Sequence, residues 1–270
     1  MLGLLLAAAA APAGAHDLFF RPRPFRPEVY DPVEVRVLSG SFVRSENAIK
    51  RERLADLALV GPQGRKALDA ALWSEDEPES ALSLRFEEPG TYVIGAALHP
   101  RPLALPAREF NAYLAEEGLD DILALRKKQG RLGEASKERY TKFLKSIVQI
   151  GGASGDGHAT VFGHAAEIVP LENPTALAAG GTLRVRCLVD GQPLRNATVF
   201  AGGRRPNSDV RLPNQRLRTD AEGVAAVQLT AAGEWFVKFV HMSEVHEPDV
   251  GYDSKWATLS FAVPASSRGR

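Results

Sequence analysis

Residues 183–189 read Leu-Arg-Val-Arg-Cys-Leu-Val, and this short stretch decides the fold class. Apolar side chains recur at every second position from Leu183 through Val185 to Cys187, with an arginine between each pair. A period of two is typical of a β-strand that turns one face toward a hydrophobic core. Cys187 is the only cysteine of the chain. Because it falls on the apolar positions, we expect it to be a buried small apolar residue rather than a reactive or ligand thiol.

Short apolar runs separated by turn residues fill the C-terminal part of the chain around this stretch. Turns are indicated at Asp190-Gly191-Gln192-Pro193 and at Thr219-Asp220-Ala221-Glu222-Gly223. Further strands are expected at 197–201, 224–229, 234–242 and 257–263. Strands of this length and spacing predict a Greek-key sandwich of the immunoglobulin-like or transthyretin-like kind over residues 165–264, followed by a tail at 265–270.

The N-terminal part shows the same kind of pattern over residues 16–104. Val33, Val35 and Val37 alternate with charged residues, and a turn is indicated at Gly61-Pro62-Gln63-Gly64. An apolar and β-branched run follows at 91–98. These features predict a second β-sandwich lobe.

Between the two lobes, residues 105–150 have the period of a helix. Pro106 opens a stretch with Phe110, Tyr113 and Leu114 on one face, Gly118 is a stop signal, and 119–126 continues the pattern. The sequence thus predicts a mainly β protein in which two sandwich lobes are joined by a short helical segment.

A second helix is predicted to begin at Ser136, a residue that favours the N-cap position. The helical spacing i, i+3, i+4, i+7, i+8 is met by Tyr140, Phe143, Leu144, Ile147 and Val148. We expect this apolar stripe to pack on one of the sheets. The glycine-rich segment 151–164, which contains His158 and His164, is interpreted as a mobile loop or hinge.

Composition excludes several classes of protein. Lysine and arginine total 33, equal to the 33 aspartates and glutamates, so no electrostatic argument favours nucleic acid or an anionic membrane as partner. A single cysteine cannot form an internal disulfide, so the core must stabilise the fold. No apolar run after the N-terminus is long enough to cross a bilayer, so we expect no membrane insertion of the mature protein.

The N-terminus predicts export and, with it, a metal site. Residues 2–11 are almost all Leu and Ala, and Ala13-Gly14-Ala15 has the small residues that signal peptidase requires. We therefore predict a signal peptide at residues 1–15 and a periplasmic or secreted location. Cleavage after Ala15 would leave His16 with both a free α-amino nitrogen and an imidazole, a bidentate seat for a divalent transition metal.

A metal site of useful affinity needs further ligands. His241 is the first candidate, because it is in phase with Trp235, Val237 and Phe239 and lies at the end of their strand. The alternative is a histidine that closes the core against Tyr252 or Trp256.

Other residues are weaker candidates for a role at this metal site. His246 lies in an expected loop with Glu244, Glu247 and Asp249, where a solvated acidic loop is the alternative, and Asp17 could add an oxygen. Asp253 could accept a hydrogen bond from His241 or cap a turn. The remaining histidines, His99, His158 and His164, are interpreted mainly as structural residues.

Several segments in order resemble one known family. They are 16–20 (His-Asp-Leu-Phe-Phe), 105–114 with 116–119, 219–223, 235–242 and 253–261. Together they resemble an exported domain-of-unknown-function family that also supplies extracytoplasmic components of nickel and cobalt uptake transporters. The resemblance implies a β-sandwich, a periplasmic or extracellular location and a role in divalent metal handling. The sequence departs from it at Leu18-Phe19-Phe20, where a tryptophan is expected, and in the histidine-containing segment 151–164.

We therefore expect a non-enzymatic protein that binds nickel, cobalt, copper or zinc for uptake or homeostasis, with a membrane metal transporter as its candidate protein partner. Imidazole and amine nitrogen suit all four metals. Two alternatives stay open. One is an interaction or structural module whose immunoglobulin-like lobes bind a protein or glycan. The other is a copper-dependent oxygenase, since a terminal histidine plus a second histidine on a β-sandwich is an arrangement those enzymes use. No nucleophile elbow or phosphate-binding loop supports another enzyme class.

Overall fold

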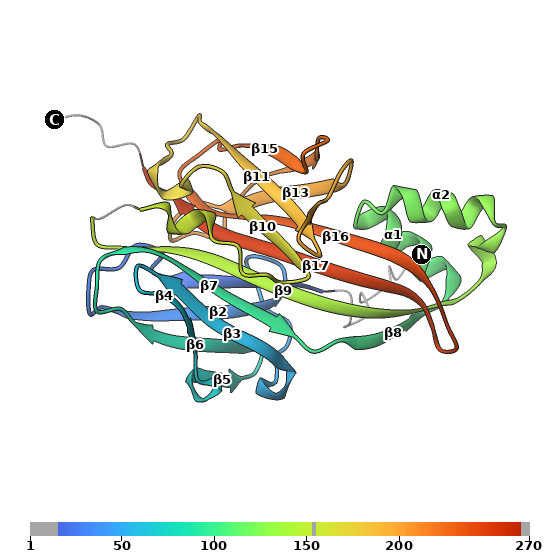
Figure 1. Ribbon diagram of the computed structural model, residues 1–270, viewed down its shortest axis with the longest axis horizontal. Coiled ribbons are helices and arrows are strands. Elements are labelled where there is room, and N and C mark those ends of the chain that lie inside the picture. Colours follow the sequence, from blue (N-terminus) through green and yellow to red (C-terminus); the bar gives the residue numbers. More distant parts are fainter. Residues whose placement is uncertain (1–15, 153–154, 266–270) are drawn as a thin grey trace, which may run out of the picture.

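The computed structural model describes residues 16–152 and 155–265. The predicted signal peptide at 1–15 lies outside the described residues, as does most of the tail. Strands dominate the described part, which forms three sheets and two α-helices (Figure 1). The prediction of a mainly β sandwich protein is confirmed. No helix in the described ranges is long and apolar enough to span a bilayer.

The three sheets are stacked as two outer layers on a long central one. The outer N-terminal sheet has the order β1 (Asp17–Arg23), β2 (Pro32–Gly40), β6 (Glu79–Arg85), β5 (Trp73–Asp76). The outer C-terminal sheet contains β10 (Ala166–Pro170), β11 (Thr182–Val189), β12 (Gln192–Pro193) and β15 (Val224–Gln228). The nine-stranded central sheet runs β14 (Arg211–Arg218), β13 (Thr198–Arg204), β16 (Gly233–Glu247), β17 (Val250–Val263), β9 (Ser136–Ile150), β7 (Gly90–Leu98), β3 (Leu54–Gly61), β4 (Gly64–Ala67), with β8 (Arg101–Leu105) paired to β9.

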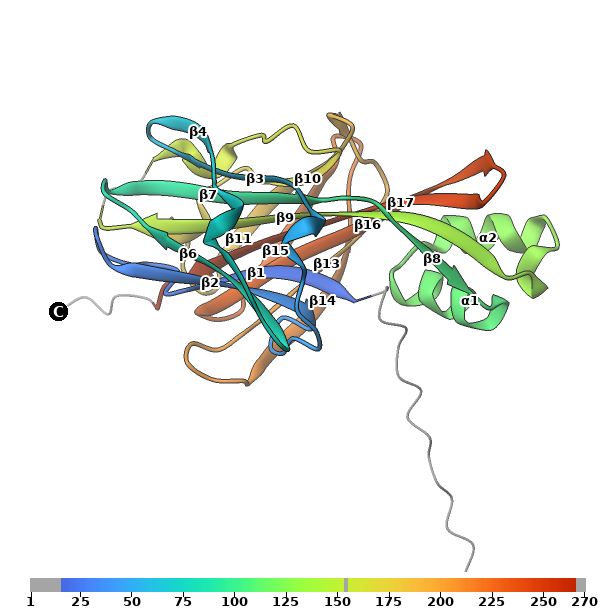
Figure 2. The same cartoon turned by 90° about the horizontal axis from the view of Figure 1, so that it is seen from below.

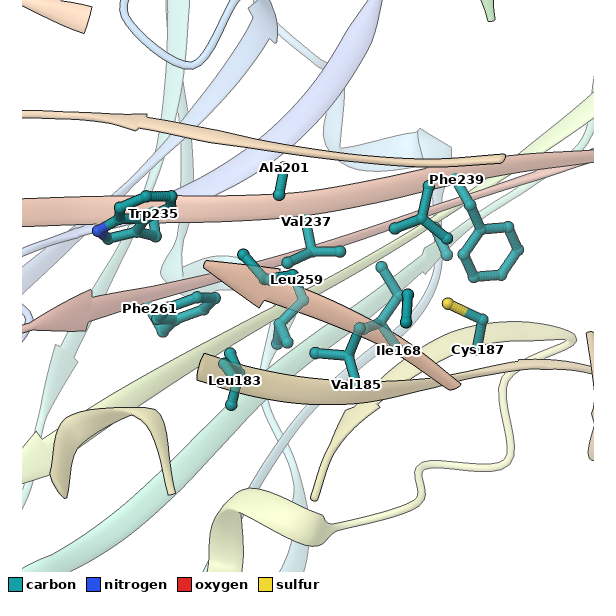
Figure 3. Close-up of a cluster of buried hydrophobic side chains, with 14 of the residues drawn as sticks. Ile168, Leu183, Val185, Cys187, Ala201, Trp235, Val237, Phe239, Leu259 and Phe261 are labelled. Carbon is teal, nitrogen blue, oxygen red and sulfur yellow. The ribbon is translucent and has the colours of Figure 1, made fainter. Parts of the chain in front are cut away.

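Each face of the central sheet packs against one outer sheet, so there are two main cores. On β7, Val93 belongs to the C-terminal core and its neighbour Ile94 to the N-terminal core, as alternation along a strand requires. The C-terminal core gathers Trp235, Leu259 and Phe261 against the strand with which the sequence analysis began (Figure 3). Cys187 is fully buried there, as predicted, and burial raises the pKa of its thiol.

Residues 136–150 form strand β9, so the predicted second helix is wrong. β9 pairs antiparallel with β7 and parallel with β17, at the middle of the central sheet. Phe143 and Ile147 enter the C-terminal core, whereas Leu144 and Val148 enter the N-terminal core. A strand buried on both faces has a nearly continuous apolar sequence, and periodicity alone does not distinguish such a run from a helix.

The helical part of the insert is restricted to α1 (Ala107–Glu116) and α2 (Asp120–Lys128). Gly118 has φ +71°, the left-handed conformation that ends a helix, which confirms the predicted stop. Both helices lie beside the projecting ends of β16 and β17 (Figures 1 and 2). They pack there on a third apolar cluster that includes Val240, Tyr252 and Trp256.

β1 is an edge strand whose free side is satisfied by side chains of the central sheet. Thr258 Oγ1 donates to the Leu18 carbonyl at 2.7 Å, and Ser260 Oγ donates to the Phe20 carbonyl at 2.5 Å. Lys142 Nζ donates to the His16 carbonyl in the same row. Unpaired carbonyls of an edge strand need partners, and these three contacts fix the position of the chain from its first described residue.

The glycine-rich segment contacts the body of the protein through two buried histidines, whereas residues such as Val161 are exposed. His158 lies in a short 3₁₀ turn and is buried. His164 is also buried, with Nε2 3.0 Å from Asp56 Oδ2 and its ring between Phe143 and Phe162. Residues 155–164 form a loop with one short 3₁₀ turn, held in place by the two buried histidines, and the mobility expected of this loop stays a prediction.

Candidate functional site

His16 lies at the start of β1, partly buried, with an exposed side-chain fraction of 11%. Its Nε2 is 3.5 Å from Glu46 Oε2, whereas its Nδ1 is buried and has no hydrogen-bond partner among the described residues. A buried ring nitrogen without a hydrogen-bond partner lowers the stability of the fold. A ligand that bonds to Nδ1 of His16 would remove that cost. Nδ1 is also the ring nitrogen closest along the chain to the α-nitrogen of the same residue.

The next residue, Asp17, belongs to a largely buried ion cluster, in which the side chains of Lys238 and Asp17 are 13% and 18% exposed. Lys238 Nζ lies 2.7 Å from Asp17 Oδ2 and 2.9 Å from Glu117 Oε2. Lys238 extends from β16, and Glu117 is the C-cap residue of α1. Asp17 Oδ1 is buried and has no partner within the described ranges. One cation thus faces two carboxylates, and one carboxylate oxygen remains unsatisfied.

The electrostatics of this cluster follow from its burial and its charge balance. Burial raises the pKa of Glu117 to about 7, against the opposing effect of Lys238. Burial by itself would lower the pKa of Lys238, but the charges of Asp17 and Glu117 outweigh it and raise that pKa above its ordinary value. With both carboxylates ionised the cluster carries one net negative charge, and Glu117 is the group that takes up a proton near neutral pH.

More buried charge lies beside this cluster under α1. Lys142 is fully enclosed, and desolvation lowers its pKa to about 8. Its ammonium group lies 4.7 Å from the ring centroid of Trp256, a favourable cation–π distance. Glu138 accepts hydrogen bonds from Tyr113 and Ser254, and burial raises its pKa. The face of the central sheet below β1 and α1 is therefore unusually rich in buried ionisable groups.

A cavity of ≈ 340 Å³ opens beside Asp17, and we call it the Asp17 cavity. It is lined by Asp17, Phe19, Gly40, Ser41, Phe42, Val43, Glu116, Phe200, Gly203, Arg211, Asn214, Phe236 and Lys238. Its volume falls within the range of small-molecule sites. The cavity therefore combines aromatic walls with charged groups of both signs.

His16 and His241 lie on opposite faces of the central sheet. His241 is in phase with Trp235 and Phe239, as predicted, and these side chains enter the C-terminal core. The cluster around Lys238 occupies the other face, because adjacent strand positions alternate. His241 is half-buried near the neighbouring Lys255, and burial is the first cause of its lowered pKa. It cannot join His16 in one coordination sphere.

The structural alternative for His241 also fails, because Tyr252 and Trp256 belong to the cluster on the face away from it. Asp253 does not accept from His241, since its carboxylate binds Arg139 at 2.7 Å. His246 is exposed and lies in β16, not in a loop. Five strand positions separate it from His241, a span of roughly 17 Å. Within the described residues, side chains of His, Cys, Asp and Glu form no group of three or more that could hold a metal ion.

Residues 13–243 match the family described as Domain of unknown function (DUF4198). The chain belongs to the DUF4198 family. No curated protein matches this DUF4198 sequence. The part of the predicted resemblance that names a domain-of-unknown-function family is therefore confirmed, and its link to nickel and cobalt transporters stays a prediction.

Three solved structures that resemble this DUF4198 chain are distant from it in sequence. The D0-D1 domain of intimin shares 13% identity, with a TM-score of 0.20, 91% of this chain and 97% of that chain covered. A DUF4785 family protein from Legionella pneumophila shares 8% identity, with a TM-score of 0.24 and coverage of 81% and 50%. The alpha-2-macroglobulin of E. coli shares 11% identity, with a TM-score of 0.23 and coverage of 94% and 14%. At these TM-scores none of the three carries an argument about function.

The sequence analysis missed Lys238, Glu117 and Lys142. Glu117 is buried because α1 ends beside Lys238, whose ammonium group donates to its carboxylate. Lys238 occupies the polar phase of its strand, which would face solvent in a two-layer sandwich. In this DUF4198 chain β1 crosses that face and encloses it. The available signal was a lysine inside the otherwise apolar run Trp-Phe-Val-Lys-Phe-Val at 235–240.

Proposed function

We propose that this is an exported, non-enzymatic protein that binds a divalent transition metal at His16 after cleavage behind Ala15, and serves metal uptake or homeostasis. The observation that carries the proposal is the side chain of His16. Its Nδ1 is buried without a partner while its Nε2 faces Glu46. In the cleaved chain, the α-amino nitrogen and Nδ1 of one residue would form a six-membered chelate, a donor pair that suits nickel, cobalt, copper and zinc.

The surroundings of His16 support this use. A carboxylate at the second ring nitrogen is the usual outer partner of a metal-bound histidine, because it fixes the tautomer and the orientation of the ring. Glu46 occupies that position. The hydrogen bond from Lys142 to the His16 carbonyl holds the backbone of the same residue.

Asp17 is less suited to the same ion than the sequence alone indicated. Neighbouring residues of an extended chain direct their side chains to opposite sides, and one oxygen of Asp17 is engaged by Lys238. His241 and His246 lie elsewhere. The remaining coordination positions would therefore be filled by solvent or by ligands that arrive with the metal, as suits a protein that passes its cargo on to a membrane transporter in the periplasm or outside the cell.

The test compares the chain that begins at His16 with the same chain carrying one extra N-terminal glycine. Each is titrated calorimetrically with Ni²⁺, Co²⁺, Cu²⁺ and Zn²⁺. We expect the extended form to lose at least tenfold in affinity, and Glu46→Gln to weaken binding by roughly tenfold, the lower end of the range for such outer partners. His241→Ala and His246→Ala are matched controls that should bind as the parent does. Equal affinity of the two starting forms would overturn the proposal.

Export has its own test. The intact mass of the protein recovered from the periplasm or medium of the expressing cell should correspond to a chain that begins at His16. A mass that retains residues before His16 would contradict the terminal site whatever the titrations show.

A further inference from the structure

The Asp17 cavity has an aromatic wall built from three strands and one loop. Phe19 of β1 contacts Phe42 and Phe236 with ring centroids 5.3 and 5.0 Å away, and Phe42 lies 5.2 Å from Phe236. Phe200 of β13 lines the cavity beside Lys238. Phe19 and Phe42 are themselves buried and support this wall from behind, while the partly exposed rings of Phe200 and Phe236 provide its apolar surface for a hydrocarbon group.

One end of the cavity is acidic. Lys238 engages Asp17 Oδ2 and both oxygens of Glu117 but leaves Asp17 Oδ1 buried without a partner in the described part of the chain. Glu116 also lines this cavity. A hydrogen-bond donor would satisfy the free oxygen of Asp17, and a cationic donor makes the stronger bond to a carboxylate. An ammonium group is such a donor, because it is cationic and carries three hydrogens.

The strand β14 provides groups of the opposite kind. Arg211 and Asn214 line the same cavity, and their side chains make no hydrogen bond or ion pair with any other described residue. Asn214 lies over Gly202, where a Cβ would come within 2.4 Å of Asn214 Oδ1, so the missing side chain at 202 makes room for the amide. A guanidinium and an amide are suitable donors to a carboxylate.

We propose that the Asp17 cavity binds a small zwitterion of the amino-acid class. Its ammonium group is received by Asp17 Oδ1, its carboxylate by Arg211 and Asn214, and its apolar side chain by the rings of Phe200 and Phe236 in the aromatic wall. The proposal is independent of metal binding, because no atom of His16 takes part in it.

The experiment uses the full mature chain with EDTA present, so that a failed metal site leaves the outcome unchanged. Thermal-shift screening of the standard amino acids identifies those that bind, and calorimetry then compares L-phenylalanine with phenethylamine and 3-phenylpropionate. We expect an apolar or aromatic amino acid to raise the melting temperature, and L-phenylalanine to bind at least tenfold more tightly than either compound that lacks one charge. The proposal is overturned if no amino acid shifts the melting temperature, or if phenethylamine and 3-phenylpropionate bind as tightly as L-phenylalanine.

Two variants separate the two ends of the ligand. Arg211→Ala should weaken L-phenylalanine and 3-phenylpropionate by about tenfold and leave phenethylamine unchanged, whereas Asp17→Asn should weaken L-phenylalanine and phenethylamine. Arg211 is exposed, so its variant remains informative even if Asp17→Asn fails to fold. Asp76→Asn and Arg186→Ala, exposed substitutions outside the cavity lining, are the matched controls. Unchanged affinity for L-phenylalanine in Arg211→Ala would contradict the assignment of that end.

Discussion

Lys238→Met removes the cation that bridges Asp17 and Glu117. The two carboxylate oxygens that it bridges lie 2.7 and 2.9 Å from Nζ. They are therefore about 5 Å apart, and two ionised carboxylates at that separation repel by about 3 kcal/mol at an effective dielectric constant of 20. Loss of one partner of a buried ion pair costs about 3–5 kcal/mol in general. We expect the variant to lose about 3 kcal/mol of unfolding free energy at pH 9.

The cost should depend on pH in a direction that the structure fixes. Burial raises the folded-state pKa of Glu117 to about 7, so its proton stabilises the folded state at low pH and this contribution is lost as pH rises through that value. Without Lys238 the pKa of Glu117 rises further. At pH 5 the carboxyl group of Glu117 is neutral in both proteins, so this repulsion disappears and we expect the variant to lose less unfolding free energy than at pH 9.

Urea denaturation at pH 5 and pH 9 measures this difference through tryptophan emission, because Trp73, Trp235 and Trp256 are all buried. The double variant Lys238→Met/Glu117→Gln should recover most of the loss at pH 9, since it removes the surplus charge. Lys66→Met, at an exposed lysine of β4, is the control and should change the unfolding free energy by less than about 0.5 kcal/mol. An equal cost at both pH values, or no recovery in the double variant, would refute the reasoning.

Three further predictions concern the two main cores and the end of α1. Lys145→Met should lower stability by about 3–5 kcal/mol, because it leaves Glu167 buried without the ammonium group that lies 3.1 Å away; calorimetric melting measures the loss, and Lys145→Met/Glu167→Gln should recover part of it. Gly118→Ala should cost about 1–2 kcal/mol or more for its left-handed backbone alone, with an additional clash where the new Cβ would lie 2.6 Å from Thr198; an unchanged denaturation midpoint would contradict this. Cys187 should resist a thiol reagent in the native protein and react in urea, because its thiol is fully buried and burial raises its pKa; rapid native labelling would show that this core opens.

The sequence pattern correctly predicted the strands that have one solvated face. It did not predict the features that arise because a third sheet packs on the central one. The alternation around Cys187 identified the outer C-terminal sheet, because only one side of that sheet is buried. β9 was assigned to a helix because both of its faces are buried, which removes the alternation that identifies a strand. Recognising it required knowledge that two sandwiches share one sheet, and no local pattern contains that information.

Of the candidate metal site, sequence reasoning placed only His16. His16 was identified from the expected cleavage, and the structure adds the position of Glu46 and the unpartnered Nδ1. His241 was assigned to the correct strand and the correct face of that strand. That His16 lies on the opposite face of the sheet could be recognised only from the position of β1. Lys238 was missed for the same reason, because β1, an edge strand distant in sequence, covers it.

The parallel pairing of β9 with β17 determines how this molecule can admit a ligand. Both strands belong to one continuous sheet, and the two main cores lie on its opposite faces. A swing of one sandwich against the other would have to break the hydrogen bonds of this pairing, so a clamshell closure of the kind used by two-domain binding proteins is not available. Residues 40–43, at the end of β2 and in the connection that follows it, line the Asp17 cavity beside this shared sheet. We therefore expect a ligand to bind without rigid-body movement of the two sandwiches, which should unfold together in one cooperative transition.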